Sequence, residues 1–172
     1  MNMESPSFEG KETEISPEYK TKIQAYALGL LKKELEELDE HKYALNQPAT
    51  PESVRNTQMG GVDRNFKLIA DIAKLYNLKE ATEYYHMIER YVSGEGQDEK
   101  VTPERKEEIQ TYLLSILEKD KELLKKGKDE LENSEEAKKM NASTQGSYIG
   151  ASDRALELVD DTIKFFGLEE LM

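Results

Sequence analysis

Two polar segments carry the residues of this sequence that are best suited to bind a ligand. One runs from Asn56 to Arg64 and the other from Thr144 to Arg154. Each combines glycines, which allow another backbone or a ligand to approach closely, with an Asp-Arg dipeptide that offers both charges. The candidate ligand-binding residues are Gln58, Gly60, Asp63, Arg64, Gln145, Gly150, Asp153 and Arg154.

The same two segments also have a structural explanation. A glycine inside a helix costs about 1 kcal/mol relative to alanine. A close helix–helix crossing would offset that cost, and a loop before the true helix start would avoid it. In the second case Asp63 and Asp153 would only favour the first helical turn. We favour the structural explanation, because on a helical wheel each Asp borders the apolar face and each Arg points away from it.

A carboxylate pair and two histidines are weaker candidates for chemistry. Glu34 and Asp120 fall on the core side of their predicted helices, where a symmetric bundle could bring them together around a metal. Such sites usually need histidines on the facing helices. Glu83 and His86 have a suitable Glu-x-x-His spacing, but the motif has no second copy. We therefore predict no metal site and no cofactor, and expect both acids to reach solvent.

Composition excludes several classes of function. The chain has no cysteine, which removes disulfides, thiolate metal sites and cysteine nucleophiles. Its net charge of −12 disfavours binding to nucleic acid and to anionic membranes. No apolar stretch approaches the length of a membrane span, and residues 1–15 lack the apolar segment of a signal peptide. The expectation is a cytoplasmic protein with a disordered tail over residues 1–15.

An internal repeat is the strongest pattern in the sequence. Placing Ser16 on Thr102, an offset of 86 positions, matches half of the residues between Pro17 and Leu38. Further along, an offset of 90 matches eight residues of each copy. We place the extra four residues of the second copy between Gln145 and Gly150. The matches at the second offset are Gly60/Gly150, Asp63/Asp153, Arg64/Arg154, Leu68/Leu158, Asp71/Asp161, Lys74/Lys164, Leu78/Leu168 and Glu80/Glu170.

Helix-start signals and apolar spacing divide each copy into two helices. Ser-Pro-Glu or Thr-Pro-Glu triplets, in which the hydroxyl caps a helix and Pro fits its first position, begin at Ser16, Thr50 and Thr102. Apolar residues at i, i+3 and i+4 then predict helices over 17–44, 51–76, 103–131 and 135–166, and a linking helix over 79–92. Asn77 and Gly167 stand where left-handed helix caps belong.

These elements predict an all-α protein, a four-helix bundle formed by two repeated hairpins about a pseudo-twofold axis, with a short crossover helix between them. Residues 16–172 would form a single domain, with repeat one at 16–81, the linking helix and loop at 82–101 and repeat two at 102–172. Since amphipathic helices abound and no catalytic set can be assembled, we expect a non-enzymatic assembly module that forms homo-oligomers or binds another helical protein. The alternative is a bundle that binds a small molecule, anion or metal near the Gly and Asp-Arg segments.

Overall fold

The computed structural model describes residues 15–78 and 101–172, and these residues form helices joined by turns, without a strand. The predicted all-helical class is confirmed. The linking helix, and residues 1–14 of the predicted tail, lie outside the described residues. The elements are α2 (Pro17–Leu45), α3 (Glu52–Leu75), α5 (Pro103–Asn133), α6 (Glu135–Lys138), α7 (Ala142–Phe165) and the short 3-10 helix η1 (Glu169–Leu171).

The two long first helices begin in the same way. The Ser16 hydroxyl accepts a hydrogen bond from the Tyr19 amide, and the Thr102 hydroxyl accepts one from the Arg105 amide, both at 3.1 Å. Each cap satisfies an amide that the first turn leaves without a partner. Thr50 differs from its prediction, because no side chain caps α3. The Thr50 hydroxyl instead donates to the Ala44 carbonyl at 2.8 Å and closes the tip of the first hairpin.

The predicted helix over 135–166 is wrong in one respect, since it is two helices. The chain leaves the helical path after Lys138, and the Asn141 side chain caps a new helix by accepting a hydrogen bond from the Thr144 amide at 2.8 Å. Our placement of the extra residues was also wrong. α3 and α7 have 24 residues each and begin at Glu52 and Ala142, so the second copy is longer at the hairpin tip and not inside α7.

Asn77 and Gly167 end the second helix of each hairpin, as predicted. Their φ angles are 53° and 68°, in the left-handed region. The next residue turns back in both cases: the Leu78 amide donates to the Ala73 carbonyl at 2.8 Å, and the Leu168 amide to the Ile163 carbonyl at 3.0 Å. This pattern satisfies helix-end carbonyls and buries both leucines.

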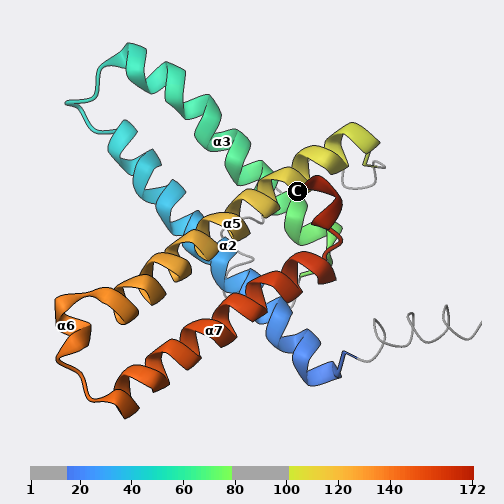
Figure 1. Cartoon of the computed structure of the whole chain (residues 1–172). Coiled ribbons are helices and arrows are strands. Elements are labelled where there is room, and N and C mark those ends of the chain that lie inside the picture. The colour runs from blue at the N-terminus through green and yellow to red at the C-terminus, as the bar shows by residue number, and fades with distance from the viewer. Residues whose placement is uncertain (1–14, 79–100) are drawn as a thin grey trace, which may run out of the picture.

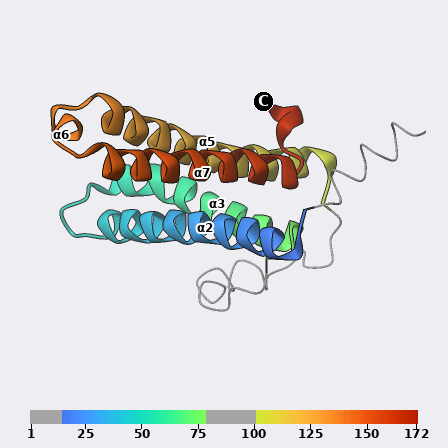
Figure 2. The ribbon, with the colours of Figure 1, turned by 60° about the horizontal axis from the view of Figure 1, so that its bottom comes forward.

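The helices form two hairpins that cross. Helices α2 and α3 pair in one layer and α5 and α7 in the other (Figure 2). The layers are not aligned: seen face-on, the hairpins make an X and their tips diverge (Figure 1). Across the layers, α2 contacts α5 and α7, and α3 contacts α5. We call the diverging parts the first arm (residues 38–60) and the second arm (residues 121–152).

The core lies at the crossing. Its fully buried large side chains come from all four long helices and from the turn after α7. Leu123, which the apolar spacing of 103–131 assigns to the core, is instead 52% exposed and lines a recess between α2 and α5. In the second arm only Ala137 is buried. The fully buried side chains are Ile23, Leu35, Phe66, Ile69, Ile72, Ile109, Leu113, Leu117, Val159, Thr162 and Leu168.

Candidate functional site

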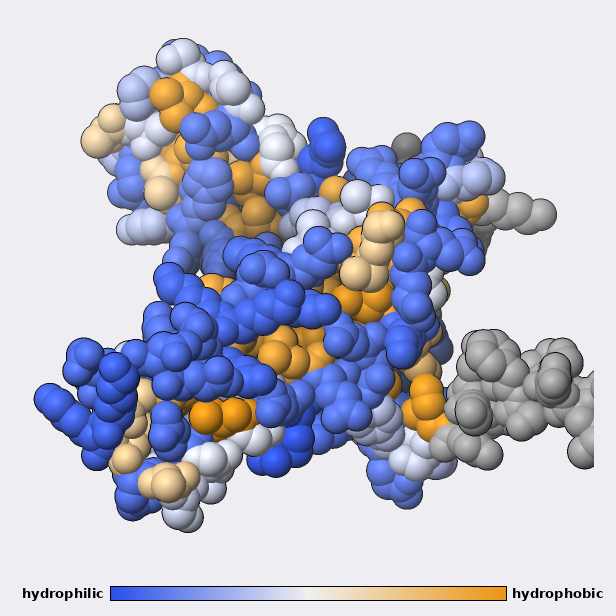
Figure 3. Space-filling model, viewed as in Figure 1, coloured by the Kyte–Doolittle hydropathy of each residue, from blue (hydrophilic) through white to orange (hydrophobic). Residues whose placement is uncertain are grey.

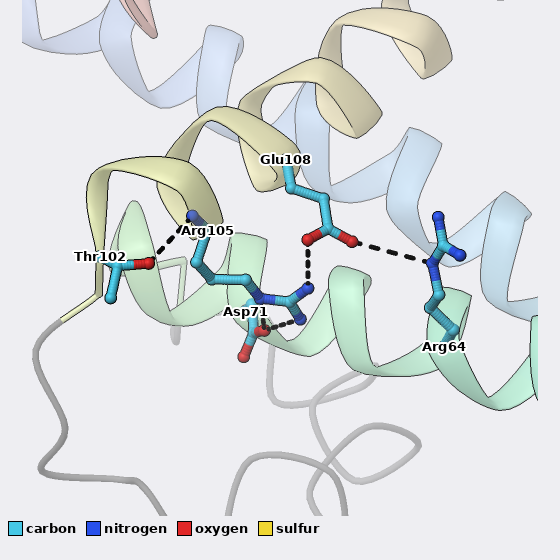
Figure 4. A network of polar contacts seen from close by, with 5 residues as sticks. All are labelled: Arg64, Asp71, Thr102, Arg105 and Glu108. Atoms are coloured by element: carbon cyan, nitrogen blue, oxygen red, sulfur yellow. Dashed lines mark hydrogen bonds and ion pairs between the residues drawn. The ribbon is translucent and has the colours of Figure 1, made fainter.

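A guanidinium–carboxylate contact joins α5 to α3 at the crossing. Arg105 donates to one oxygen of Asp71 from Nε at 3.2 Å and from Nη2 at 2.5 Å. Its Nη1 lies 3.0 Å from Glu108, which in turn lies 3.7 Å from Nε of Arg64 on α3 (Figure 4). Burial alone would lower the pKa of Arg105, but its bonds to Asp71 and Glu108 outweigh this and raise it. The network therefore fixes the first turns of α5 against the middle of α3.

A tyrosine–carboxylate contact joins α2 to α7 at the matching place. The Tyr19 hydroxyl donates to the carboxylate of Asp161. Burial, this hydrogen bond and the charges of Asp161 and Glu157 raise the pKa of Tyr19 to about 12. Tyr19 and Arg105 are equivalent at the first offset of the repeat, and Asp161 and Asp71 at the second. The two contacts therefore involve positions that match in the sequence alignment, with a tyrosine donor in one and an arginine donor in the other.

A second repeated contact joins α2 to α5. The Tyr26 hydroxyl donates to Asp120, and burial followed by this bond raises the pKa of Tyr26. The equivalent Tyr112 has its pKa raised by burial and then by the charges of Glu34 and Glu37. Glu34 occupies the position that matches Asp120 in the sequence, and the pKa of each tyrosine is raised by acids of the other hairpin.

Two equivalent aromatic residues meet where the second helices end. The rings of Tyr76 and Phe166 lie 4.7 Å apart between centroids and are tilted by 59°. The Tyr76 hydroxyl donates to the Phe166 carbonyl at 3.3 Å and accepts from the Gln110 amide at 3.1 Å. An equivalent pair that contacts itself in this way marks the place where a twofold axis would pass.

The predicted carboxylate pair lies between α2 and α5. Glu34 and Asp120 line one small recess between α2 and α5, together with Lys33 and Lys119. Lys119 lies 3.2 Å from Glu34, and its bond to this acid raises the pKa of the ammonium group. We expected both acids to reach solvent. They instead share a recess in which Lys119 bonds to Glu34. Within 15–78 and 101–172, no three His, Cys, Asp or Glu side chains are grouped so as to hold a metal ion.

The glycines of the predicted ligand site lie within unbroken helices, where Gly60 is exposed and Gly150 is partly buried. A Cβ added to Gly60, Gly61 or Gly146 would meet no described atom outside its local helix within 4 Å, and one added to Gly150 would meet only the side chain of Arg154 at 3.4 Å. Both structural explanations given above are therefore wrong for this chain: the glycines are neither in a loop nor at a helix crossing. Within the described residues, no close backbone contact offsets the free-energy cost of these glycines to the helix.

The structure does not bring the two Asp-Arg segments together. Arg64 contacts α5 at Glu108, whereas Asp153 contacts α5 at Lys128, at 2.6 Å. These two positions of α5 are twenty residues apart, which is about 30 Å along a helix. Of the other predicted site residues, Gln58 bonds to His41 at 2.9 Å, Gln145 donates to the Leu131 carbonyl at 2.7 Å, and Asp63 and Arg154 are exposed. Ligand binding at these eight residues stays a prediction.

Sequence reasoning overlooked a groove between α3 and α5. It has a volume of about 480 Å³ and contains one predicted site residue, Arg64. Three acids of α5 line it, Glu104, Glu107 and Glu108, with Tyr112 half-buried at its wall. In the sequence these acids follow the i, i+3, i+4 spacing that places residues on one face of a helix, and this spacing could have indicated the acidic face. Since acids outnumber Arg64, the groove favours a cation over an anion.

No family model, curated protein or solved structure matches this chain. Among the described residues, none of the helices combines the length and the apolar character that crossing a membrane would require.

Proposed function

We propose that this chain is a non-enzymatic helical assembly module that associates with itself, built as a four-helix arrangement of two duplicated hairpins about a pseudo-twofold axis. The observation that carries the proposal is the pairing of contacts at the crossing. Tyr19–Asp161 and Arg105–Asp71 are equivalent contacts between the hairpins. A duplicated hairpin that contacts its own copy in this way has a self-complementary surface, which is what twofold homo-oligomers use.

The aromatic pair supports the same axis. In a twofold arrangement, a residue near the axis packs against its own equivalent, as Tyr76 does against Phe166. The repeat also matches the helix starts and the left-handed caps at Asn77 and Gly167. These correspondences support a two-hairpin unit that folds by pairing with a second unit, whether from the same chain or from another.

Light scattering coupled to gel filtration tests self-association directly. We expect the molar mass to rise to that of a dimer or a higher oligomer over about a hundredfold range of concentration, since association follows mass action. A strictly monomeric chain across that range would overturn the proposal.

A different helical protein is the other partner compatible with this surface. The arms expose large apolar side chains, including Tyr43 at 72% and Tyr148 at 51%. Figure 3 shows apolar surface on the arms and at the crossing, between charged residues. The net charge of −12 favours a protein partner over nucleic acid or an anionic membrane. We retain the cytoplasmic location expected from the sequence as part of this proposal.

A ligand-binding bundle is the second candidate function, and the groove between α3 and α5 favours it. Its acids Glu104, Glu107 and Glu108 outnumber Arg64, which suits an organic cation. A thermal-shift screen with divalent metals, polyamines, nucleotides and inorganic anions tests it, because a ligand of the folded state raises the unfolding temperature. An increase with cations that the Glu104→Gln, Glu107→Gln variant loses would support a site in the groove. An unchanged unfolding temperature with every compound would overturn this alternative.

A further inference from the structure

Within 15–78 and 101–172, the interface between the two hairpins is built from side chains of the hairpins themselves. The core side chains and the polar contacts of the crossing join α2 or α3 to α5 or α7. In the sequence, the hairpins are connected only through residues 79–100, between Leu78 and Val101. The contacts that hold the molecule together would therefore be the same if the two hairpins belonged to different copies of the chain.

The connection is long enough for that exchange. Twenty-two residues can span about 70 Å when extended. The longest helix, α5, has 31 residues and is about 46 Å long. Even if the predicted linking helix over 79–92 forms, its fourteen residues and eight extended ones span about 47 Å, which matches the longest element, so the connection does not force the hairpins of one chain to pack on each other.

We propose that the surface through which the α2/α3 hairpin packs on the α5/α7 hairpin is also the surface through which two copies of the chain associate, by exchange of hairpins. This inference rests on the proposed self-association and names its interface. In the exchanged dimer, Tyr19 of one copy bonds to Asp161 of the other, and Arg105 to Asp71. Exchange of identical elements is a low-cost route to a dimer, because it creates no new interface.

Charge disfavours the pairing of two α2/α3 hairpins. Exchange keeps Arg64 of α3 beside Glu108 of α5. If two α2/α3 hairpins paired in the same geometry, the equivalent of Glu108 would be Lys22, and Arg64 would face a like charge. Such a contact is repulsive, although weakly because Arg64 is exposed, and it disfavours the pairing of two α2/α3 hairpins.

Cysteine pairs test the exchange in the full-length chain, which contains no cysteine of its own. Glu37 and Lys119 face each other across the hairpins, with 3.3 Å between Oε2 and Nζ, and their side chains are 46% and 57% exposed. Glu37→Cys and Lys119→Cys chains carrying different tags are co-expressed, and the purified material is treated with a short bis-maleimide. Only exchange places the thiol introduced at position 37 of one chain beside the thiol introduced at position 119 of another.

The matched control replaces Lys119→Cys with Lys125→Cys. Lys125 is as exposed as Lys119, at 54%, but its ion pair is with Glu122 of its own helix. We expect on the order of tenfold more cross-linked heterodimer for the 37/119 combination than for 37/125, because cysteines held side by side react at a high effective concentration.

The outcomes separate this inference from the proposed function. A dimer by light scattering that shows no excess of the 37/119 product would overturn exchange and leave self-association standing. If samples of Glu37→Cys alone gave as much cross-linked dimer as the 37/119 combination, like hairpins would be pairing. That result would also overturn exchange. A chain that stays monomeric would overturn both.

Discussion

Tyr76 and Phe166 pack ring against ring, with centroids 4.7 Å apart, although ninety positions separate them and each ends the second helix of its own repeat. Aromatic pairs in such tilted geometry contribute about 0.5–1.5 kcal/mol beyond the area that they bury. The same two residues are also joined by the hydrogen bond from the Tyr76 hydroxyl to the Phe166 carbonyl. The ends of α3 and α7 are therefore joined by both a ring contact and a hydrogen bond.

Replacement of Arg105 by alanine should lower the free energy of unfolding by about 1–2 kcal/mol. The side chains of Arg105 and Asp71 are 27% and 23% exposed, so the substitution leaves a partly desolvated carboxylate without its donor. Urea unfolding followed by circular dichroism measures the change. The control is Arg64→Ala in the same network: Arg64 is 71% exposed and lies 3.7 Å from its partner, so its removal should cost less than about 0.5 kcal/mol. Equal losses in both variants would contradict this ranking.

Tyr26→Phe should destabilise the chain by about 1 kcal/mol. The phenylalanine keeps the ring in place but removes the hydroxyl that donates to Asp120 between α2 and α5. Tyr148→Phe is the matched control, because Tyr148 is 51% exposed on the second arm. Thermal and urea unfolding of both variants provide the measurement. A Tyr26→Phe chain as stable as the wild type would mean that the bond to Asp120 contributes nothing to the crossing.

Stability should fall at alkaline pH. The folded chain raises the pKa of Tyr19 from 10.0 to about 12, so above pH 10 the unfolded chain releases a proton that the folded chain still holds. The contribution is fully present below pH 10 and is lost as the pH rises towards about 12. Tyr26 and Tyr112 have raised pKa values and act in the same direction.

Urea unfolding at about pH 8 and about pH 11 measures this loss, and absorbance of the phenolate follows the titration itself. In Tyr19→Phe the decrease in stability between the two pH values should be smaller than in the wild type. A free energy of unfolding that does not change between the two pH values would contradict the prediction.

Gly60→Ala and Gly61→Ala should each stabilise the isolated chain by about 0.5–1 kcal/mol. Both glycines lie within α3, and an added methyl group meets no neighbour in the described residues. Gly167→Ala is the opposing control: its φ of 68° is left-handed, and alanine there should cost about 1–2 kcal/mol. Differential scanning calorimetry measures all three. If Gly60→Ala lowered stability or weakened the dimer, another backbone would have to approach α3 at this point.

Local signals in the sequence predicted the helices well. Ser16 and Thr102 start their helices through the expected side-chain caps, and Asn77 and Gly167 end theirs in the expected conformation. Thr50 shows the limit of such signals. It stands in the same triplet, yet its hydroxyl bonds to the carbonyl of Ala44, which the hairpin tip brings within reach. The Thr50 hydroxyl could either cap α3 or bond at the hairpin tip. Which bond forms depends on the backbone conformation of the tip, which the triplet does not show.

The candidate site could not be predicted to the same extent, because it depends on how the hairpins cross. Apolar spacing places Leu123 in the core, but nothing local shows that it lies at an exposed recess between α2 and α5. The repeat identified equivalent residues such as Tyr26 and Tyr112. It could not show that each lies beside the acid of the other copy, since that follows from the crossing of the layers.

Burial in the α5/α7 hairpin is confined to one end. Between Leu117 and Val159, the only buried residue is Ala137. Backbone amides of the second arm therefore depend on two-helix packing alone and should open to hydrogen exchange at a far lower free energy than those at the crossing. The second arm can therefore bend or open locally while the buried core at the crossing stays folded.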